Sequence, residues 1–229
     1  MSKNFSAAIV LAGGSGKRFG RDKCVAIVND YPLVYHSFKT IFATGFMDIF
    51  VLVYHSESQK DFINKYIEKT DFIFFEKGGD DRKSSVWNGL NFLKKNFPKV
   101  KNIFIHDGAR PLVTAKNIID LNEKIKNHPA AVLYHKITDT VISSEEGCVN
   151  YIDRNTLYAI ETPQAFDFSL IHDSYKSAIE NGIDLPDDSS AIIDRSQIQF
   201  IENKTWNIKV TFPGDLGIVG ALLSCGNFS

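Results

Sequence analysis

The chain has 229 residues, of which 44% are hydrophobic and 12% aromatic, a composition that can build a buried core. Lys and Arg number 26 against 27 Asp and Glu, a formal net charge of -1, so no global positive field draws the chain to nucleic acid. The N-terminus has no secretory-signal pattern, and no apolar run approaches the roughly 18 residues that span a bilayer. We therefore expect a soluble, cytoplasmic protein with neither nucleic acid nor membrane as a partner.

Cysteine and histidine usage argues against a metal site built by the protein. The three cysteines, Cys24, Cys148 and Cys225, are odd in number and far apart, which is typical of reduced thiols and not of a disulfide framework or a zinc knuckle. The six histidines show no metal-binding spacing. We predict no metal-ligating residues.

Alternating apolar and amphipathic segments predict the fold class. Short runs rich in Val, Ile and Phe are typical of strands buried on both faces, and they occupy residues 7–11, 49–54, 72–75, 103–105 and 131–134. Longer amphipathic stretches predict helices over residues 32–44, 56–69, 84–96 and 114–127. Strands and helices in alternation predict an α/β fold with a mostly parallel sheet and helices on both of its faces.

The alternation becomes irregular after residue 135. β-branched residues on either side of a Glu146-Gly147 turn predict a hairpin, so we expect a β-arm over residues 135–160 that projects from a single domain of residues 1–229. Asp167 is expected to cap a helix that runs through Asn181. A last strand region and a closing helix that begins near Pro213 complete the prediction.

A glycine-rich loop follows the first predicted strand in "IVLAGGSGKRFGRDK", residues 9–23. Glycines allow another group to approach the backbone, and their exposed N–H groups suit a phosphate, beside which Lys and Arg add positive charge. A plain strand-to-helix turn with a solvated basic start explains the stretch equally well, because short glycine motifs recur by chance. Both interpretations stay open for this loop taken alone.

Two further polar clusters follow predicted strands, where ligands of parallel sheets bind. In "GGDDRKSSV" a carboxylate can accept the hydroxyl hydrogens of a ribose and Ser85 can bond a base edge, although the run is also a good turn. "HDGARP" places Asp107 and Arg110 after an apolar strand, as a ligand site or as a structural ion pair. His106 is interpreted as a buried, hydrogen-bonded imidazole without a catalytic role.

Hydroxyl and cationic side chains in the C-terminal half could hold a phosphate. Thr140, Arg154 and Thr162 lie in or beside the predicted arm and offer the groups that bind a phosphomonoester. Lys209 is a lone cation among apolar neighbours in "NIKVT", a placement that favours a cleft over a solvated surface.

These segments together resemble one family, the cytidylyltransferases that make CDP-linked polyol phosphates. The family includes the 2-C-methyl-D-erythritol 4-phosphate and ribitol 5-phosphate cytidylyltransferases. The resemblance covers residues 7–223 in a fixed order of motifs: "LAGGSGKRFG", "GGDDRKSSV", "HDGARP", "DT", "DRNTLY", "TPQAF" and "NIKVTFPGDL". It implies a Rossmann-like nucleotidyltransferase domain, a β-arm that interlocks two subunits in a homodimer, and Mg²⁺ as the cofactor.

The resemblance also implies roles for individual residues. Four residues of the glycine loop would hold the phosphates of CTP, namely Ala12, Gly13, Gly14 and Gly16. The catalytic cations would be Arg18, Lys23 and Lys209, the last at the α-phosphate. The nucleoside would be bound at its ribose by Gly79 and Asp80 and at its cytosine by Ser85. The polyol phosphate would be held at its hydroxyls by Asp107 and Arg110 and at its phosphate by Thr140, Arg154 and Thr162, some of them from the partner subunit.

The chain departs from the family pattern at three places. Asp22 and Cys24 flank Lys23 where Pro and Gln are usual, and an ion pair between Asp22 and Lys23 would weaken the positive charge available to a phosphate. Gly108 replaces a usual Ala, which is a mild change. Pro186-Asp187-Asp188 replaces a usual Thr-Asp, which removes a hydroxyl near the polyol phosphate.

Three alternatives remain at this level. The "LAGG" motif also occurs in ribitol 5-phosphate cytidylyltransferases, although "DRNTLYAIETPQ" resembles the methylerythritol members more closely. The Asp-Lys pair resembles molybdenum-cofactor nucleotidyltransferases, which lack "HDGARP" and "TPQ". A non-catalytic nucleotide-binding scaffold is disfavoured because it would need no convergence of charged side chains on one cleft.

Overall fold

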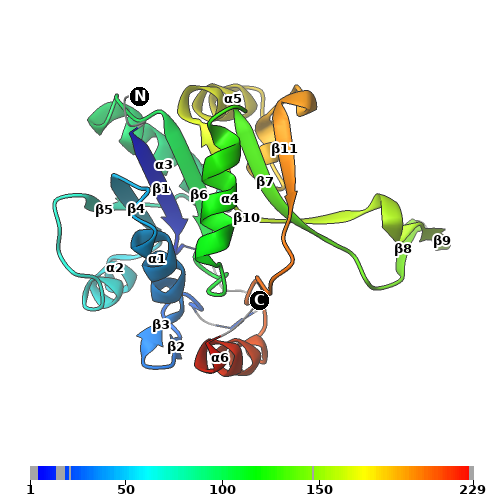
Figure 1. Ribbon diagram of the computed structural model, residues 1–229, viewed down its shortest axis with the longest axis horizontal. Helices are drawn as coiled ribbons and strands as arrows, with labels where there is room; N and C mark the ends of the chain where they lie inside the picture. The colour runs from blue at the N-terminus through cyan, green and yellow to red at the C-terminus, as the bar shows by residue number, and fades with distance from the viewer. Residues whose placement is uncertain (1–4, 14–18, 21, 146, 227–229) are drawn as a thin grey trace.

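The computed structural model describes residues 5–13, 19–20, 22–145 and 147–226. One seven-stranded sheet forms its centre (Figure 1), in the order β11 (Ile198–Glu202), β7 (Ala130–Lys136), β10 (Tyr158–Asp167), β6 (Asn102–Asp107), β1 (Ser6–Leu11), β4 (Ile49–Tyr54) and β5 (Ile73–Lys77). Strands β6, β1, β4 and β5 run parallel, as do β11 and β7. Strand β10 is antiparallel to both of its neighbours. The α/β fold with a mostly parallel sheet is therefore confirmed.

Helices cover both faces of the sheet (Figure 1). One face packs against α1 (Leu33–Ala43), α2 (Glu57–Asn64) and α4 (Ala115–Ile125). The other face packs against α3 (Arg82–Asn96) and α5 (Phe168–Glu180). Along β1, Ala7 and Ile9 face one core and Ala8 and Val10 face the other. Because both faces of β1 are buried among apolar neighbours, its sequence is a continuous apolar run without alternation.

A third, smaller core lies beyond the C-terminal ends of the parallel strands. It joins α6 (Asp215–Cys225) to the short hairpin of β2 (Ile27–Val28) and β3 (Tyr31–Pro32). Val219 of α6 is fully buried there. Among the helices of the described segments, none is long and apolar enough to cross a membrane.

Local sequence signals predicted most helix boundaries. Asp167 caps α5 by accepting from the Leu170 amide, as expected. Thr114, at the start of the helix predicted over residues 114–127, caps α4 by accepting from the Asn117 amide. Helix α2 is shorter than predicted. It ends at Asn64, and residues 65–69 are not helical.

Strand β10 is the main departure from the predicted elements. Its sequence, with Glu161, Thr162 and Gln164 around Pro163, was not expected to form a central strand, since polar residues and proline are unusual there. The structure buries these polar side chains between β6 and β7 and supplies each with hydrogen bonds. The register shifts between Ile160 and Gln164, and the Thr162–Pro163 peptide bond is cis.

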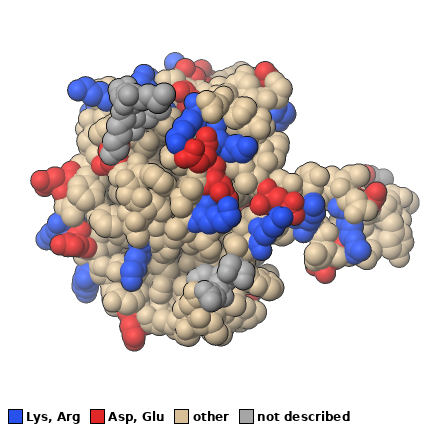
Figure 2. Space-filling model, in the orientation of Figure 1, with Lys and Arg blue, Asp and Glu red and all other residues tan. Residues whose placement is uncertain are grey.

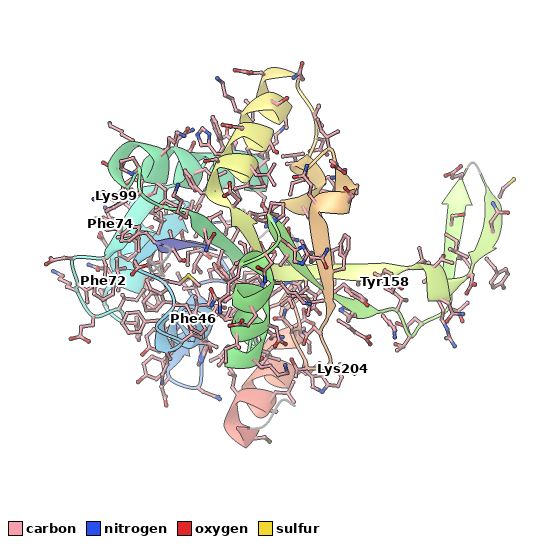
Figure 3. All side chains as sticks on the ribbon, turned by 45° about the horizontal axis from the view of Figure 1, so that its top comes forward. Phe46, Phe72, Phe74, Lys99, Tyr158 and Lys204 are labelled. Carbon is pink, nitrogen blue, oxygen red and sulfur yellow. The ribbon has the colours of Figure 1, made fainter. Side chains whose placement is uncertain are left out.

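A β-hairpin extends from this body. Strands β8 (Val141–Glu145) and β9 (Cys148–Ile152) pair with each other and project well away from the sheet (Figure 1). Tyr158 lies where the arm joins the body (Figure 3). Tyr151 on the arm is 81% exposed. On the face drawn in Figure 2, Lys and Arg side chains lie next to Asp and Glu side chains along the arm.

Candidate active site

The sheet topology brings the polar motifs that follow the parallel strands to one edge of the sheet. Strands β1, β4, β5 and β6 are parallel, so the segments after Leu11, Tyr54, Lys77 and Asp107 meet at the same edge. Antiparallel β10 pairs Gln164 with Ile105 and thereby brings Thr162 to the end of β6. The Asp107 amide donates to the Thr162 hydroxyl oxygen at 3.0 Å.

The start of the glycine loop is fixed by hydrogen bonds inside the fold. The amides of Ala12 and Gly13 both donate to the carbonyl of Val53, at 2.9 and 3.0 Å. These two amides are therefore already engaged in this structure. The predicted phosphate ligands Gly14 and Gly16 and the cation Arg18 lie outside the described residues.

Gln59 of α2, which the sequence did not single out, ties this loop to the segment that carries Lys23. Its carboxamide nitrogen donates to the Ala12 carbonyl at 2.9 Å and to Asp22 Oδ2 at 2.6 Å, and its oxygen accepts from the His55 amide at 2.7 Å. Asp22 also accepts from the Cys24 amide. Burial raises the pKa of Asp22, although these donors oppose the shift. Its carboxylate is thus held by a backbone amide and by Gln59.

Lys23 reaches the segment that carries Lys209, although the two residues lie far apart in the sequence. Lys23 Nζ donates to the carbonyl of Val210, the residue after Lys209, at 2.8 Å. Buried Cys24 feels the same charges: burial raises its pKa to about 12, and Asp107 and Lys209 contribute opposing effects. Two of the three predicted catalytic cations therefore reach one end of the sheet.

The predicted nucleoside-binding loop is closely packed. The Ser85 hydroxyl accepts from the Gly79 amide at 3.1 Å and donates to the Asp81 carbonyl at 2.7 Å. A Cβ built on Gly79 would lie 2.3 Å from the Ser84 hydroxyl oxygen, so a larger side chain at 79 forces this turn apart. Asp81 caps α3 in a reciprocal capping box with Ser84. Asp80 is exposed, so its carboxylate is open to a ligand.

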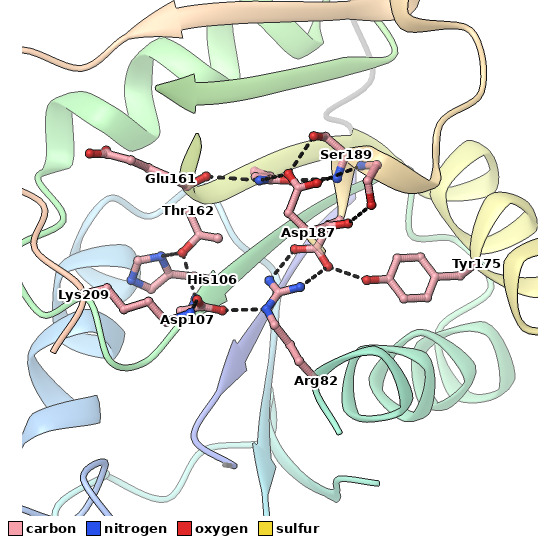
Figure 4. Close-up of polar contacts among 12 residues, drawn as sticks. Arg82, His106, Asp107, Glu161, Thr162, Tyr175, Asp187, Ser189 and Lys209 are labelled. Carbon is pink, nitrogen blue, oxygen red and sulfur yellow. Dashed lines mark hydrogen bonds and ion pairs between the residues drawn. The ribbon is translucent and has the colours of Figure 1, made fainter. Parts of the chain in front are cut away.

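Asp107 is held by two cations (Figure 4). Its Oδ1 lies 3.0 Å from Arg82 Nε and its Oδ2 lies 2.5 Å from Lys209 Nζ. Burial alone would raise the pKa of Asp107, but Arg82 and Lys209 outweigh burial and hold that pKa well below its usual range. The carboxylate is therefore charged at neutral pH. Of its two ion-pair partners the sequence had assigned a role to Lys209 alone.

His106 is buried with partners at both ring nitrogens, as the sequence interpretation held. Its Nε2 lies 3.2 Å from the Arg110 carbonyl and its Nδ1 lies 3.2 Å from the Thr162 hydroxyl. Burial lowers the pKa of His106 to about 4, so the ring is neutral at physiological pH.

Arg110 contacts the segment that carries Lys209. Its Nη1 donates to the Asn207 carbonyl at 2.8 Å, and its Nε is buried without a partner among the described residues. The predicted alternative of a direct ion pair between Asp107 and Arg110 does not describe the carboxylate's contacts, which are to Arg82 and Lys209. A buried, unpartnered donor is expected to meet a ligand or water.

Glu161 anchors the segment 203–209, which follows β11 and is not a strand. Its Oε2 accepts from the side-chain amides of Asn203 and Asn207, at 2.8 and 2.9 Å, and its Oε1 lies 2.6 Å from His135 Nδ1. Asn207 also donates to the Thr162 carbonyl. These contacts fix the position of Lys209, two residues further on. No local sequence signal predicts these contacts, because the partners lie 26 to 46 residues apart in the chain.

The structure separates the predicted polyol-phosphate ligands into two groups. Thr162 lies at the end of β6, beside Asp107. Thr140 and Arg154 lie on the exposed arm, where Arg154 Nη1 donates to the Thr138 carbonyl at 2.5 Å. The arm points away from the central sheet (Figure 1).

Fold and site together are those of an α/β enzyme of the nucleotidyltransferase class, in which the segments after β1, β5 and β6 begin at one sheet edge and Lys209 pairs there with Asp107. The family model described as "IspD: 2-C-methyl-D-erythritol 4-phosphate cytidylyltransferase" matches residues 6–224. The chain belongs to this family of cytidylyltransferases.

Individual relatives agree along nearly the whole chain. The 2-C-methyl-D-erythritol 4-phosphate cytidylyltransferase of Clostridium beijerinckii is 36% identical over 220 residues, covering 92% of this chain and 94% of the relative. The enzyme of the same name from Lachnoclostridium phytofermentans is 33% identical over 227 residues, with 94% and 95% covered. The crystal structure of 4-diphosphocytidyl-2C-methyl-D-erythritol synthase from Anaerococcus prevotii superimposes with a TM-score of 0.84 at 26% identity, covering 97% of this chain and all of that one.

Proposed function

We propose that this chain joins CTP to 2-C-methyl-D-erythritol 4-phosphate, giving the CDP-linked polyol and pyrophosphate. The observation that carries the proposal is the placement of two cations in a chain of this family: Lys23 donates to the carbonyl of Val210, and the preceding residue, Lys209, pairs with the Asp107 carboxylate. A scaffold that only bound a nucleotide would not need these cations at the sheet edge where phosphates bind.

The proposed reaction is an in-line displacement at phosphorus. A phosphate oxygen of the polyol phosphate attacks the α-phosphorus of CTP, the bond from that phosphorus to the bridging oxygen of the β-phosphate breaks, and pyrophosphate leaves with the electron pair. Negative charge grows on the bridging and equatorial oxygens as this happens. Lys23 and Lys209 are positioned to neutralise that charge, and no covalent enzyme intermediate is needed.

Mg²⁺ is the proposed cofactor. Among the residues that the structure describes, no group of three or more His, Cys, Asp and Glu side chains is placed to hold a metal ion. Mg²⁺ prefers phosphate oxygens and water as ligands, so an ion that enters bound to the triphosphate of CTP needs no such group of side chains. When bound it would neutralise charge on the CTP phosphates.

The proposed assembly is a homodimer in which the arm completes the other subunit's site. A projecting hairpin with exposed apolar residues such as Ile142, Val149 and Tyr151 favours contact with a second chain. Thr140 and Arg154 of the partner subunit would then reach the phosphate of the polyol bound near Thr162.

The proposed location of the enzyme is the cytoplasm, because its three free cysteines suit a reducing compartment.

Pyrophosphate release tests the function directly. CTP and Mg²⁺ are incubated with the enzyme and either 2-C-methyl-D-erythritol 4-phosphate, ribitol 5-phosphate or no acceptor. Release with the first acceptor alone is expected. Release with ribitol 5-phosphate alone would reassign the substrate, and no release with either would refute the transferase proposal for this chain.

A further inference from the structure

Arg82, the first residue of α3, is anchored by the buried side chain of Asp188. Its Nη1 and Nη2 form a paired contact with the two carboxylate oxygens of Asp188, at 2.8 and 2.6 Å, and Tyr175 donates its hydroxyl to Asp188 Oδ1 at 2.5 Å (Figure 4). Asp188 and Tyr175 are fully buried. A two-pronged guanidinium–carboxylate contact fixes both distance and plane. The contacts with Asp188 thus fix the orientation of the Arg82 guanidinium beside the site.

The third nitrogen of the same guanidinium reaches the active-site carboxylate. Arg82 Nε holds Asp107 Oδ1, while Lys209 holds the other oxygen of Asp107. The two cations and the two carboxylates make a neutral group of four. Tyr175 lies on the side of Arg82 away from Lys209 (Figure 4), and Asp188 bonds both Tyr175 and Arg82, so this pair stabilises Arg82 from the side opposite the lysine.

Lys209 is the member of this group that a ligand can reach most easily. The side-chain exposures are 37% for Lys209, 27% for Arg82, 9% for Asp107 and 0% for Asp188. If Lys209 turned to a phosphate with no other cation at Asp107, a nearly buried carboxylate would be left unpaired, which is strongly unfavourable. With Arg82 in place, Asp107 keeps a partner throughout.

We propose that Arg82 is a positioning residue of the transfer: anchored by Asp188 and Tyr175, it holds and neutralises Asp107, so that Lys209 can leave this carboxylate for a substrate phosphate. The inference rests on the proposed function for the destination of Lys209. The ion network itself can be tested without substrate. Within the segment Pro186-Asp187-Asp188, Asp188 is the anchor for Arg82.

Amine labelling of Lys209 in the substrate-free enzyme tests the network. An acetylating reagent is applied briefly, and the modified fraction of Lys209 is measured by mass spectrometry, with Lys116, which pairs with exposed Asp120, as the internal reference. In Arg82→Met, Asp107 has Lys209 as its remaining cation, so Lys209 labels more slowly than in the wild type. In Asp188→Asn, Arg82 turns wholly to Asp107, so Lys209 labels faster.

A slower reaction in Arg82→Met is a result that a loosened fold cannot give, because loosening would expose Lys209 and speed its labelling. Should the buried charge of Asp188 prevent Arg82→Met from folding, the charge-balanced double variant Arg82→Met/Asp188→Asn is expected to show the same slowing. Arg195→Met is the matched control, because Arg195 donates to the carbonyls of Ser189 and Ser190 in the same loop. It should leave Lys209 labelling unchanged.

Steady-state kinetics supply the second measurement. The kcat of Arg82→Met should fall roughly tenfold to a hundredfold, as expected when a reacting group is displaced, while the KM for CTP changes less. Unchanged kcat, or Lys209 labelling that is equal or faster in the Arg82→Met variants, would overturn the proposal. If the wild-type enzyme releases no pyrophosphate, the proposed function fails, whereas the labelling result still decides whether Arg82 controls the ion pair of Lys209.

Discussion

The Thr162 hydroxyl lies 3.2 Å from Nδ1 of buried His106 and joins the ring to the end of β6. His106 Nε2 faces the Arg110 carbonyl, which can only accept, so Nε2 carries the hydrogen and Nδ1 is the acceptor. The Thr162 hydroxyl therefore donates to His106 while it accepts from the Asp107 amide. A neutral ring is required for this arrangement.

Stability should fall in acid because of His106. Burial lowers the pKa of His106 from 6.5 to about 4, so between these pH values the unfolded chain binds a proton that the folded chain does not. The free energy of unfolding then decreases as the pH falls, by up to about 1.4 kcal/mol per pH unit from this residue. The wild type and His106→Gln are compared by urea unfolding from pH 7 to pH 4. Their difference should shrink toward pH 4 by about 3 kcal/mol, and a pH-independent difference would contradict the assignment.

Lys23→Ala and Lys209→Ala should each lower kcat more than they weaken CTP binding. Their charge matters most as pyrophosphate leaves, so each loss is expected to be about two to four kcal/mol of transition-state stabilisation. Pyrophosphate release gives kcat, and calorimetric titration gives CTP affinity. Lys116→Ala, at an exposed ion pair on α4, is the control. An equal loss in kcat and in CTP affinity would indicate a role in ground-state binding.

Arg154 should act on the acceptor and from the other subunit. Arg154→Ala is expected to raise the KM for the polyol phosphate and to leave CTP affinity unchanged, since Arg154 lies on the arm. Dimers mixed from Arg154→Ala and Lys23→Ala chains contain one site with neither change if the arms are exchanged. Activity above that of either variant alone is the expected sign, and no recovery in verified mixed dimers would mean that each site uses its own arm.

Gln59 should stabilise the loop that carries Lys23. Gln59→Ala leaves the Ala12 carbonyl, the His55 amide and Asp22 without this partner, at a cost of about 1–3 kcal/mol for each buried group left unsatisfied. Urea unfolding should show the loss and steady-state kinetics a higher KM for CTP. Gln197→Ala, which removes an exposed contact with Asp194, should change stability by less than about 0.5 kcal/mol. Equal effects of the two substitutions would show that the Gln59 contacts contribute little.

Local patterns were sufficient to predict the body of the fold. The strand over residues 49–54 was predicted with its observed bounds, and the cap Asp167 was identified in advance. These features depend on neighbouring residues: an apolar run needs burial on both faces, and a capping side chain bonds an amide three residues away. The order of strand and helix likewise predicted that the polar segments after the first, third and fourth strands would share an edge.

The sequence by itself thus determined the α/β class, the family and the chemical types gathered at the site. Only the tertiary structure decided which charges pair. Arg82 and Asp188 are 106 residues apart, and Lys209 and Asp107 are 102 apart. It also placed β10 at the centre of the sheet, because the hydrogen bonds that allow Glu161 and Thr162 to be buried come from distant segments. Local propensity describes what one segment favours, whereas the pairing of buried charges depends on which segments the packed sheet brings within hydrogen-bond distance.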